Sequence, residues 1–328
     1  MKPHQSQEKS QATPEQKIKV ALAQIAPVWF DREATIKKVC EHIIKASEKS
    51  ARLVAFGEAL VPGYPFWLDA TNGAKFNDKR QKSIQAEYAK QAVQIERGDL
   101  KSVCKTAKEN NIAVYLGVIE RPKDRTGHSL YCSLVYIDSN GEIKSVHRKL
   151  MPTYEERLSW SIGDGHGLVT HSLEAFTVGG LNCWENWMPL ARASLYAQGE
   201  DLHVAVWPGN YRNTFDLTPV IAKEGRSYVL SVSSIFNADH AKNSPIEIPE
   251  LAQSESWLAD GGSCIAAPDG TWVIEPQVKT EGVFVAEIDH QIVREERQNF
   301  DPAGHYSRPD VTRLTVDRTR QSTTHFID

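Results

Sequence analysis

The sequence contains no long hydrophobic run, no large excess of charge of one sign and no closely spaced pair of cysteines. A membrane-spanning helix needs roughly 18 consecutive apolar residues, and no stretch approaches that length, so no membrane partner is expected. The formal net charge of -4 supplies no basic excess to bind a phosphate backbone, which argues against nucleic acid as a partner. The five cysteines include no Cys-x-x-Cys pair, which argues against a disulfide framework and a zinc site.

The two ends of the chain are polar. The N-terminal residues MKPHQSQEKSQATPEQ include no apolar segment of the kind that a secretory signal carries. We therefore predict a cytoplasmic protein with a disordered polar tail at residues 1–16. Residues 312–328 are predicted to form a C-terminal tail. No linker, internal repeat or low-complexity segment interrupts the chain between these ends, so a single domain over residues 17–311 is expected.

The composition between these ends is that of a globular protein. Of the 328 residues, 41% are hydrophobic and 24% are charged, which excludes disorder and collagen-like repeats. Short β-prone apolar runs alternate with segments of helical spacing, and hairpins are interspersed. This pattern predicts an α/β fold with one mixed sheet or two sheets and with helices on the outside. The strands are predicted at 18–25, 52–56, 112–119, 130–137, 142–147, 204–207, 227–233, 263–267 and 283–288, and helices at 36–44, 100–107 and 189–198.

One cysteine occupies a position suited to nucleophilic chemistry. Cys183 lies in the segment GGLNCWEN, where an apolar strand meets a turn before the helix at 189–198. A nucleophile on such a turn projects away from the backbone, and the amide N–H groups that follow can donate to an oxyanion. The nearby helix N-terminus also favours a thiolate. The alternative for Cys183 is a buried structural role, which is the expectation for the other cysteines, Cys40, Cys104, Cys132 and Cys264.

A cysteine nucleophile needs a base to form its thiolate. None of the eleven histidines has a recognisable pairing context, and His147 and His203 are expected to be hydrogen-bonded structural residues. Glu58 directly follows the buried run RLVAF and Gly57, and desolvation there makes a carboxylate a better base at neutral pH. Lys149 follows the second hairpin strand, where it could neutralise a developing oxyanion. Taken singly, each of these two residues is more often a solvated charge at a strand end.

Taken together, the segments around these residues resemble the nitrilase branch of the carbon–nitrogen hydrolase superfamily. The matching segments are FGEALVPGYPFW, HRKLMPTYEERLSWSIGDG, NCWENWMPLAR and, near the end, GHYSRPDV. The resemblance extends from about residue 18 to residue 311. One departure is Gly57, because many members have proline before the glutamate. Glycine is expected to loosen the backbone there and to leave the carboxylate in place.

The resemblance implies both a fold and a set of site residues. The implied fold is a four-layer α-β-β-α sandwich with two stacked mixed sheets. The implied triad comprises Glu58 as general base, Lys149 as oxyanion stabiliser and proton donor, and Cys183 as nucleophile. A second glutamate, Glu156, would position Lys149. Members of the family usually form homodimers, and nitrilases proper often extend into spirals, so a homo-oligomer built partly through the helix at 189–198 is expected.

The implied reaction is hydrolysis of an organic nitrile to a carboxylic acid and ammonia through a thioimidate and a thioester. The backbone N–H of Trp184 would join Lys149 in stabilising negative charge. No metal or organic cofactor is expected, and the segment GDGHG at 163–167 lacks the GxGxxG spacing of a dinucleotide site. By resemblance, Tyr64 and Trp207 would line an aromatic substrate pocket, with core packing as the alternative for both.

Other activities remain open at this point. The residues WEN after the cysteine and PTYEER after the lysine resemble nitrilases more than the amidases of the superfamily. An apolar pocket would suit aliphatic or arylaliphatic nitriles, which the sequence does not separate. An amidase and a cyanide-hydrolysing enzyme are alternatives within the superfamily. A catalytically silent scaffold is a further alternative, although a scaffold would not need all four of the site residues.

Overall fold

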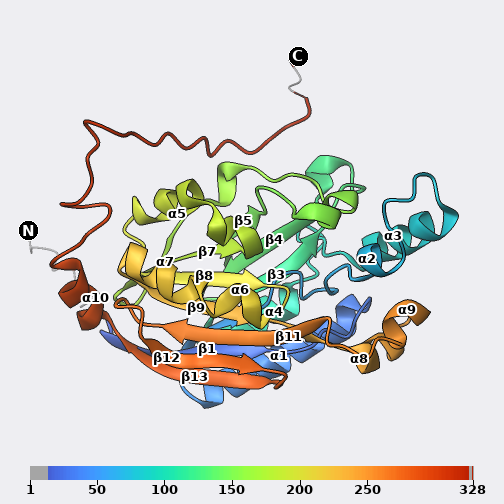
Figure 1. Cartoon of the computed structure of the whole chain (residues 1–328), viewed down its shortest axis with the longest axis horizontal. Coiled ribbons are helices and arrows are strands. Elements are labelled where there is room, and N and C mark those ends of the chain that lie inside the picture. Colours follow the sequence, from blue (N-terminus) through green and yellow to red (C-terminus); the bar gives the residue numbers. More distant parts are fainter. Residues whose placement is uncertain (1–13, 325–326, 328) are drawn as a thin grey trace, which may run out of the picture.

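The computed structural model describes residues 14–324 and residue 327 (Figure 1). It contains two β-sheets that pack face to face, with helices on the outer side of each sheet. Most of the predicted polar tail at residues 1–16 lies outside the described residues.

The first sheet has six strands in the order β13-β1-β2-β3-β4-β5. The central strands β1, β2 and β3 run parallel, and the outer pairs are antiparallel. These central strands are almost continuously buried because one face meets the second sheet and the other face meets helices. The strands are β1 (Lys17–Gln24), β2 (Ala51–Phe56), β3 (Ala113–Glu120), β4 (Tyr131–Ile137), β5 (Ile143–Arg148) and β13 (Gly282–Asp289).

The second sheet has seven strands in the order β10-β11-β9-β8-β7-β6, with β12 paired to β11. Here β7, β8 and β9 run parallel, and the remaining pairs are antiparallel. The strands are β6 (His171–Leu173), β7 (Phe176–Asn182), β8 (Leu202–Trp207), β9 (Tyr228–Ser233), β10 (Ile235–Phe236), β11 (Ala259–Ala266) and β12 (Trp272–Val278).

The helices form the two outer layers. The first sheet is covered by α1 (Arg32–Glu48) and α4 (Lys101–Glu109), and the second by α5 (Pro189–Tyr196), α6 (Tyr211–Thr214) and α7 (Leu217–Gly225). Figure 1 shows four further helices at one end of the molecule and α10 (His290–Arg297) at the other. These four are α2 (Trp67–Ala70), α3 (Lys79–Gln91), α8 (Ala238–Lys242) and α9 (Pro249–Ala252). Short 3-10 helices are η1 (Lys123–Arg125), η2 (Tyr154–Leu158), η3 (Gly165–Gly167) and η4 (Cys183–Trp187).

The main core lies between the sheets, where apolar side chains of both inner faces meet. Leu22 and Leu53 of the first sheet belong to the same buried cluster as Val204 and Leu230 of the second. The four-layer α-β-β-α arrangement implied by the resemblance is therefore confirmed. The helix α3 is absent from the sequence prediction because it is mostly polar and buries only Ile84 and Tyr88 fully.

Beyond α10 the chain ends in an extended segment. Residues 312–324 contain no helix or strand and run along the side of the molecule that carries α5 (Figure 1). Arg320 pairs with Asp164 at 3.0 Å, which ties this segment to the body of the protein. Among the helices in residues 14–324, none is long and apolar enough to cross a membrane.

Candidate active site

Glu58 lies immediately beyond β2, where the chain leaves the first sheet. Its backbone N–H donates to the carbonyl oxygen of Trp207 at a distance of 3.0 Å. Because Trp207 ends β8, this hydrogen bond joins the two sheets beside the site. The side chain of Glu58 is fully buried, as the sequence predicts for a carboxylate at the end of a buried strand.

Gly57 permits this close approach of the two sheets. A Cβ atom on Gly57 would lie 2.3 Å from Oγ of Ser234 and 3.1 Å from the carbonyl oxygen of Trp207. The sequence suggested only that glycine loosens the backbone here. The structure gives a different reason, since the second sheet occupies the space that any side chain at this position would need.

Lys149 lies immediately beyond β5, and its side chain is fully buried. Its backbone N–H donates to the carbonyl oxygen of Cys132 on β4 at 2.8 Å, which extends the β4–β5 pairing by one residue. Its ammonium Nζ lies 2.8 Å from Oε1 of Glu58 and 2.7 Å from Oε2 of Glu156. A buried ammonium is tolerated because two carboxylates compensate for its lost hydration.

Glu156 is held in place by three hydrogen bonds. It lies in η2, where its Oε2 accepts from the backbone N–H of Thr153 at 2.6 Å as part of a capping box. The same oxygen accepts from Lys149, and Oε1 accepts from the hydroxyl of Tyr64 at 2.8 Å. This carboxylate therefore fixes the direction of the Lys149 side chain.

Cys183 occupies the turn between β7 and α5, as the sequence predicts. β7 ends at Asn182, and Cys183 begins η4 with a φ of 45°, in the left-handed region that residues other than glycine rarely adopt. The side chain is buried but lines a cavity.

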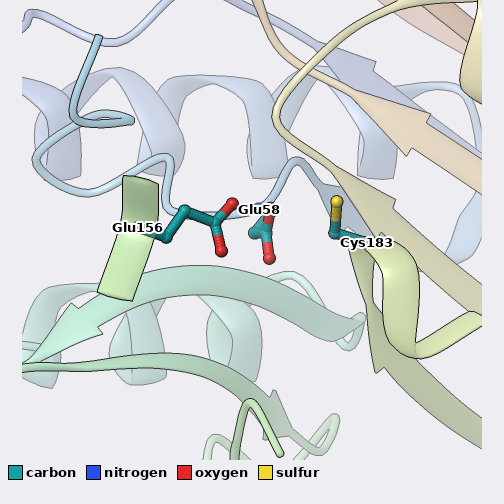
Figure 2. Close-up of side chains that lie close together, drawn as sticks. All are labelled: Glu58, Glu156 and Cys183. Carbon is teal, nitrogen blue, oxygen red and sulfur yellow. The ribbon is translucent and has the colours of Figure 1, made fainter. Parts of the chain in front are cut away.

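Two carboxyl groups and one thiol lie close together in this site. Figure 2 shows Glu58 between Glu156 and Cys183, with the two carboxyl groups facing one another. One oxygen of each carboxylate and the sulfur of Cys183 all lie within 4.8 Å of one another. Oε1 of Glu58 pairs with Lys149, whereas Oε2 is buried and forms no hydrogen bond with any residue that the structure describes. That second oxygen is available to accept a proton.

Burial and mutual interactions set the charges of this cluster. Burial raises the pKa of Glu58 to about 7, although Lys149 opposes the rise. Burial would lower the pKa of Lys149, but Glu58, Cys183 and Glu156 raise it well above its ordinary value. Burial and the nearby Glu58 raise the pKa of the Cys183 thiol. The resting site therefore holds a neutral thiol, an ammonium ion and a carboxyl group that titrates near neutrality.

A second cysteine lies against the candidate base. Cys132 is fully buried on β4, as expected of a structural cysteine, but its Sγ also lies 3.5 Å from Oε1 of Glu58. Burial and Glu58 raise the pKa of this thiol, so it remains a neutral hydrogen-bond donor. The sequence offers no local signal for this contact, because Cys132 on β4 and Glu58 in the turn after β2 are 74 residues apart. The other three cysteines do not share this position, and all five are free thiols.

Glu185 is a further buried carboxylate that the sequence analysis did not single out. Its Oε2 accepts from the backbone N–H of Asn182 at 2.7 Å, and its Oε1 accepts from the N–H of Leu150 at 2.6 Å. Both oxygens lie 3.0 Å from Nε2 of His147. Burial would raise the pKa of Glu185, but His147 and the two backbone N–H groups lower it. Glu185 thus fastens the turn of the cysteine to the segment that follows Lys149.

A cavity of about 420 Å³ opens beside Cys183. Tyr64, one of the two residues for which the resemblance implies a place in the pocket, contributes to its wall, and so does Trp184. Charged and polar groups also line it, so the cavity is less apolar than the sequence suggested. Its polar lining comprises Asp69, Thr153, Glu155, Glu156, Asn210, Arg212 and Asn213.

Trp207 is not among the residues that line this cavity. Its side chain is buried in a cluster with Cys183, Ala205 and Ile221. The side chain of a residue at a strand end points to one face or the other, and here it points into the layer covered by α7. Trp207 is therefore packed in the core beside the nucleophile, and its part in substrate binding stays a prediction.

Residues 19–298 match the family model for carbon-nitrogen hydrolases. The chain belongs to the carbon-nitrogen hydrolase family. Within the family, the predicted place in the nitrilase branch is also confirmed. A protein named nitrilase 2 from an unknown prokaryotic organism is 36% identical over 95% of this chain and 96% of its own length. An aliphatic nitrilase from Rhodococcus rhodochrous is 33% identical over 95% of this chain and 82% of its own length.

Solved structures of the superfamily share the fold of this carbon-nitrogen hydrolase. The NitFhit protein of C. elegans superposes with a TM-score of 0.69 at 18% identity, covering 95% of this chain and 70% of that one. An amidase from Nesterenkonia superposes with a TM-score of 0.61 at 16% identity, covering 89% of this chain and 98% of that one. At such identities the likeness concerns the fold alone.

Proposed function

We propose that this carbon-nitrogen hydrolase is a nitrilase that converts an organic nitrile to a carboxylic acid and ammonia. The observation that carries the proposal is the buried group of Cys183, Glu58 and Lys149 beside a cavity, with one oxygen of Glu58 free. Relatives named nitrilase over almost the whole chain support a nitrile as the substrate.

In the proposed cycle Glu58 first takes the proton of the Cys183 thiol. A carboxyl group with a pKa of about 7 is matched to this task at neutral pH. The sulfur attacks the nitrile carbon, and the nitrile nitrogen receives the proton through Lys149 and Glu58, which gives a thioimidate. Lys149 and the backbone N–H of Trp184 stabilise the negative charge that develops on nitrogen.

Two molecules of water complete the reaction. The first, activated by Glu58, adds to the thioimidate carbon, and the tetrahedral intermediate expels ammonia to leave a thioester. The second water, activated in the same way, attacks the thioester carbonyl. The carbon–sulfur bond then breaks, which releases the carboxylic acid and returns the thiol of Cys183. Glu156 holds Lys149 in position throughout.

The proposed chemistry needs no metal or organic cofactor. Glu58, Glu156 and Cys183 are close enough together to resemble a metal site. The ammonium of Lys149, however, lies within 2.8 Å of both carboxylates and already compensates for part of their charge. Electrostatic stabilisation of the developing anion is therefore assigned to Lys149 and to a backbone N–H group.

The proposal also extends to compartment and assembly. Five free thiols fit the reducing conditions of the cytoplasm, where we place the protein. We further propose that it forms a homodimer or a larger homo-oligomer, which could be a spiral, and that the contact lies in the region of α5. The exposed aromatic and aliphatic side chains next to this helix fit such an interface. They are Trp187, Met188, Leu190, Phe215 and Val220.

The test of the proposed activity is release of ammonia from an aliphatic nitrile, an arylacetonitrile, the corresponding amides and cyanide. We expect turnover of at least one nitrile, no measurable turnover by Cys183→Ala, and a folded variant by circular dichroism. Cys104→Ala on α4 is the matched control and should retain activity with some loss of stability. Turnover of amides or cyanide without nitriles would replace the proposal by the corresponding alternative. Full activity in Cys183→Ala would refute the nucleophile.

A further inference from the structure

Three fully buried polar residues form a chain of hydrogen bonds behind the nucleophile. Asn186 lies in η4, three residues after Cys183, and its Oδ1 is 2.7 Å from Nε2 of His203 in β8. Nδ1 of His203 is 2.9 Å from Oε1 of Glu200, which precedes β8. None of the three side chains is exposed. The mechanism described above assigns no task to any of them.

The direction of these hydrogen bonds follows from counting donors and acceptors. Nδ2 of Asn186 donates to the carbonyl oxygens of Cys183 at 2.9 Å and of Leu181 at 3.2 Å. Its Oδ1 must therefore accept, so Nε2 of His203 must carry a proton. Nδ1 of His203 and Oε1 of Glu200 then share one further proton. Hydrogen-bond donation thus runs from the histidine through the amide to the carbonyl group of the nucleophile.

That carbonyl belongs to the same peptide unit as the N–H of Trp184. A trans peptide is planar, so its C=O and N–H groups point in opposite directions. A donor fixed on the C=O side orients the N–H on the other side and also polarises it. Burial and Glu58 raise the pKa of the Cys183 thiol, and the Trp184 N–H opposes that rise, which places this N–H on the side of the sulfur.

We propose that Asn186, His203 and Glu200 are positioning residues that orient and polarise the Cys183–Trp184 peptide toward the anion formed on the substrate. This inference rests on the proposed function, because it assigns the Trp184 N–H to charge stabilisation. The three residues touch no substrate. Their effect is transmitted through one peptide plane to the Trp184 N–H. It therefore bears mainly on steps that create an anion at the substrate, and to a smaller extent on the Cys183 thiolate, which the same N–H favours.

Two reagents that react with Cys183 distinguish stabilisation of the anion on the substrate from reactivity of the sulfur. Acylation by p-nitrophenyl acetate passes through a tetrahedral oxyanion, expels p-nitrophenolate and leaves an acetyl thioester. Alkylation by iodoacetamide forms a sulfur–carbon bond at a tetrahedral carbon and expels iodide, with no oxyanion. The burst of p-nitrophenolate therefore reports the oriented N–H, and the alkylation rate reports the sulfur alone. Neither probe requires that the physiological substrate be a nitrile.

The main variant is Asn186→Leu, which keeps the approximate volume and removes both donations to the carbonyl groups. We expect its acylation rate and the kcat for a nitrile to fall by about ten- to a hundredfold, as for loss of support to an active-site donor. The KM should stay within about twofold of wild type. The alkylation rate should fall by a much smaller factor than the acylation rate, because the Trp184 N–H has only a secondary influence on the thiolate. Glu200→Gln keeps the shape and removes the charge, and it should give a smaller loss of several-fold in acylation only.

The pair of Asp201 and His290 provides a matched control. It is also a buried carboxylate and histidine, 2.8 Å apart, and it adjoins Glu200 in sequence. Neither member hydrogen-bonds to η4. Asp201→Asn should therefore lower the melting temperature without changing the ratio of acylation to alkylation.

The outcomes are distinct. A selective fall of acylation in Asn186→Leu and Glu200→Gln supports the positioning chain. Equal falls of acylation and alkylation would mean that the turn has collapsed, and unchanged acylation would mean that the N–H needs no support; either result overturns the inference. Absence of nitrile turnover in the wild-type protein, with its acylation burst intact, would instead count against the proposed function.

Discussion

Glu58 combines three circumstances that a catalytic base requires. It is fully buried, one of its oxygens pairs with Lys149, and the other has no hydrogen-bond partner among residues 14–324. Burial favours the neutral form and the ammonium favours the charged form, and the balance leaves the pKa of Glu58 at about 7. A small change in either influence would shift this pKa, so the base is sensitive to its surroundings.

This balance predicts the acidic limb of the pH profile. The proposed base acts only when deprotonated, and its pKa is raised from 4.5 to about 7. The value of kcat/KM should therefore be low at pH 5, rise through about pH 7 and level off above it. A profile from pH 5 to 9 checks this, with near-ultraviolet circular dichroism to confirm that the fold persists. An acidic limb near pH 4.5 would show that Glu58 does not control turnover.

Replacement of Lys149 by arginine tests whether the site needs a particular cation. The ammonium Nζ fits between two carboxylates at 2.8 and 2.7 Å in a fully buried position. A guanidinium group is wider and planar, so Lys149→Arg should lower kcat by about a hundredfold or more despite the preserved charge. Steady-state kinetics measure the loss, and Lys144→Arg on the exposed side of β5 is the control. A near-normal kcat in Lys149→Arg would mean that position 149 supplies only a positive charge and that the shape of the cation does not matter.

Some of these residues are predictable from local sequence, and others are not. Cys183 stands at a visible change from strand to helix, and Glu58 ends an apolar run, so each carries a local signal. The contact of Cys132 with Glu58, by contrast, depends on how β4 lies beside the turn after β2. Glu185 joins two segments 35 residues apart. Such contacts depend on strand order and on the stacking of the sheets, which residue spacing does not encode.

At the scale of the elements, the backbone is closely packed at the end of β2. A Cβ on Gly57 would meet Ser234, and a Cβ on Gly117 of β3 would lie 2.2 Å from the carbonyl oxygen of Gly57. The turn that presents Glu58 is thus enclosed on one side by β3 and on the other by the chain after β9. Two glycines allow backbone to pack on backbone, which leaves Glu58 little freedom to move.

Gly57→Ala adds only one methyl group, but it should lower the activity strongly. The added methyl group has no space, so the turn must shift and carry Glu58 away from Cys183. We expect kcat to fall by at least about tenfold and the free energy of unfolding by about 1–3 kcal/mol, as for other overpacking substitutions. Urea unfolding and kinetics measure both quantities. Gly199→Ala is the control, since a Cβ there meets no atom within 4 Å, although its positive φ costs some stability. Unchanged activity in Gly57→Ala would show that the turn can relax.

At the scale of the whole molecule, α5 faces two environments. One face of this helix packs within its own subunit, since Ala191, Ser194 and Leu195 are buried. Leu190, in contrast, is 66% exposed and lies seven residues after Cys183. It adjoins the exposed aromatic and aliphatic side chains that we propose as the surface of assembly.

Leu190→Glu should weaken this assembly and, through the turn of Cys183, the activity. A charge buried at an apolar interface is costly unless it is paired, so dissociation is expected at protein concentrations where the wild type is oligomeric. Light scattering and ammonia release should fall together. Ile44→Glu on α1, which lies in the opposite outer layer of the sandwich, is the control (Figure 1). A wild-type protein that is monomeric and fully active at working concentration would contradict the proposed role of this surface.

The site is divided between the two sheets. Glu58 and Lys149 follow strands of the first sheet, whereas Cys183 follows β7 of the second. A slip of one sheet over the other by little more than the width of an atom would leave every strand intact and yet separate the sulfur from its base. The rate of turnover therefore depends on the relative position of the two sheets. It should fall when the packing between the sheets first weakens, before spectroscopy detects any unfolding.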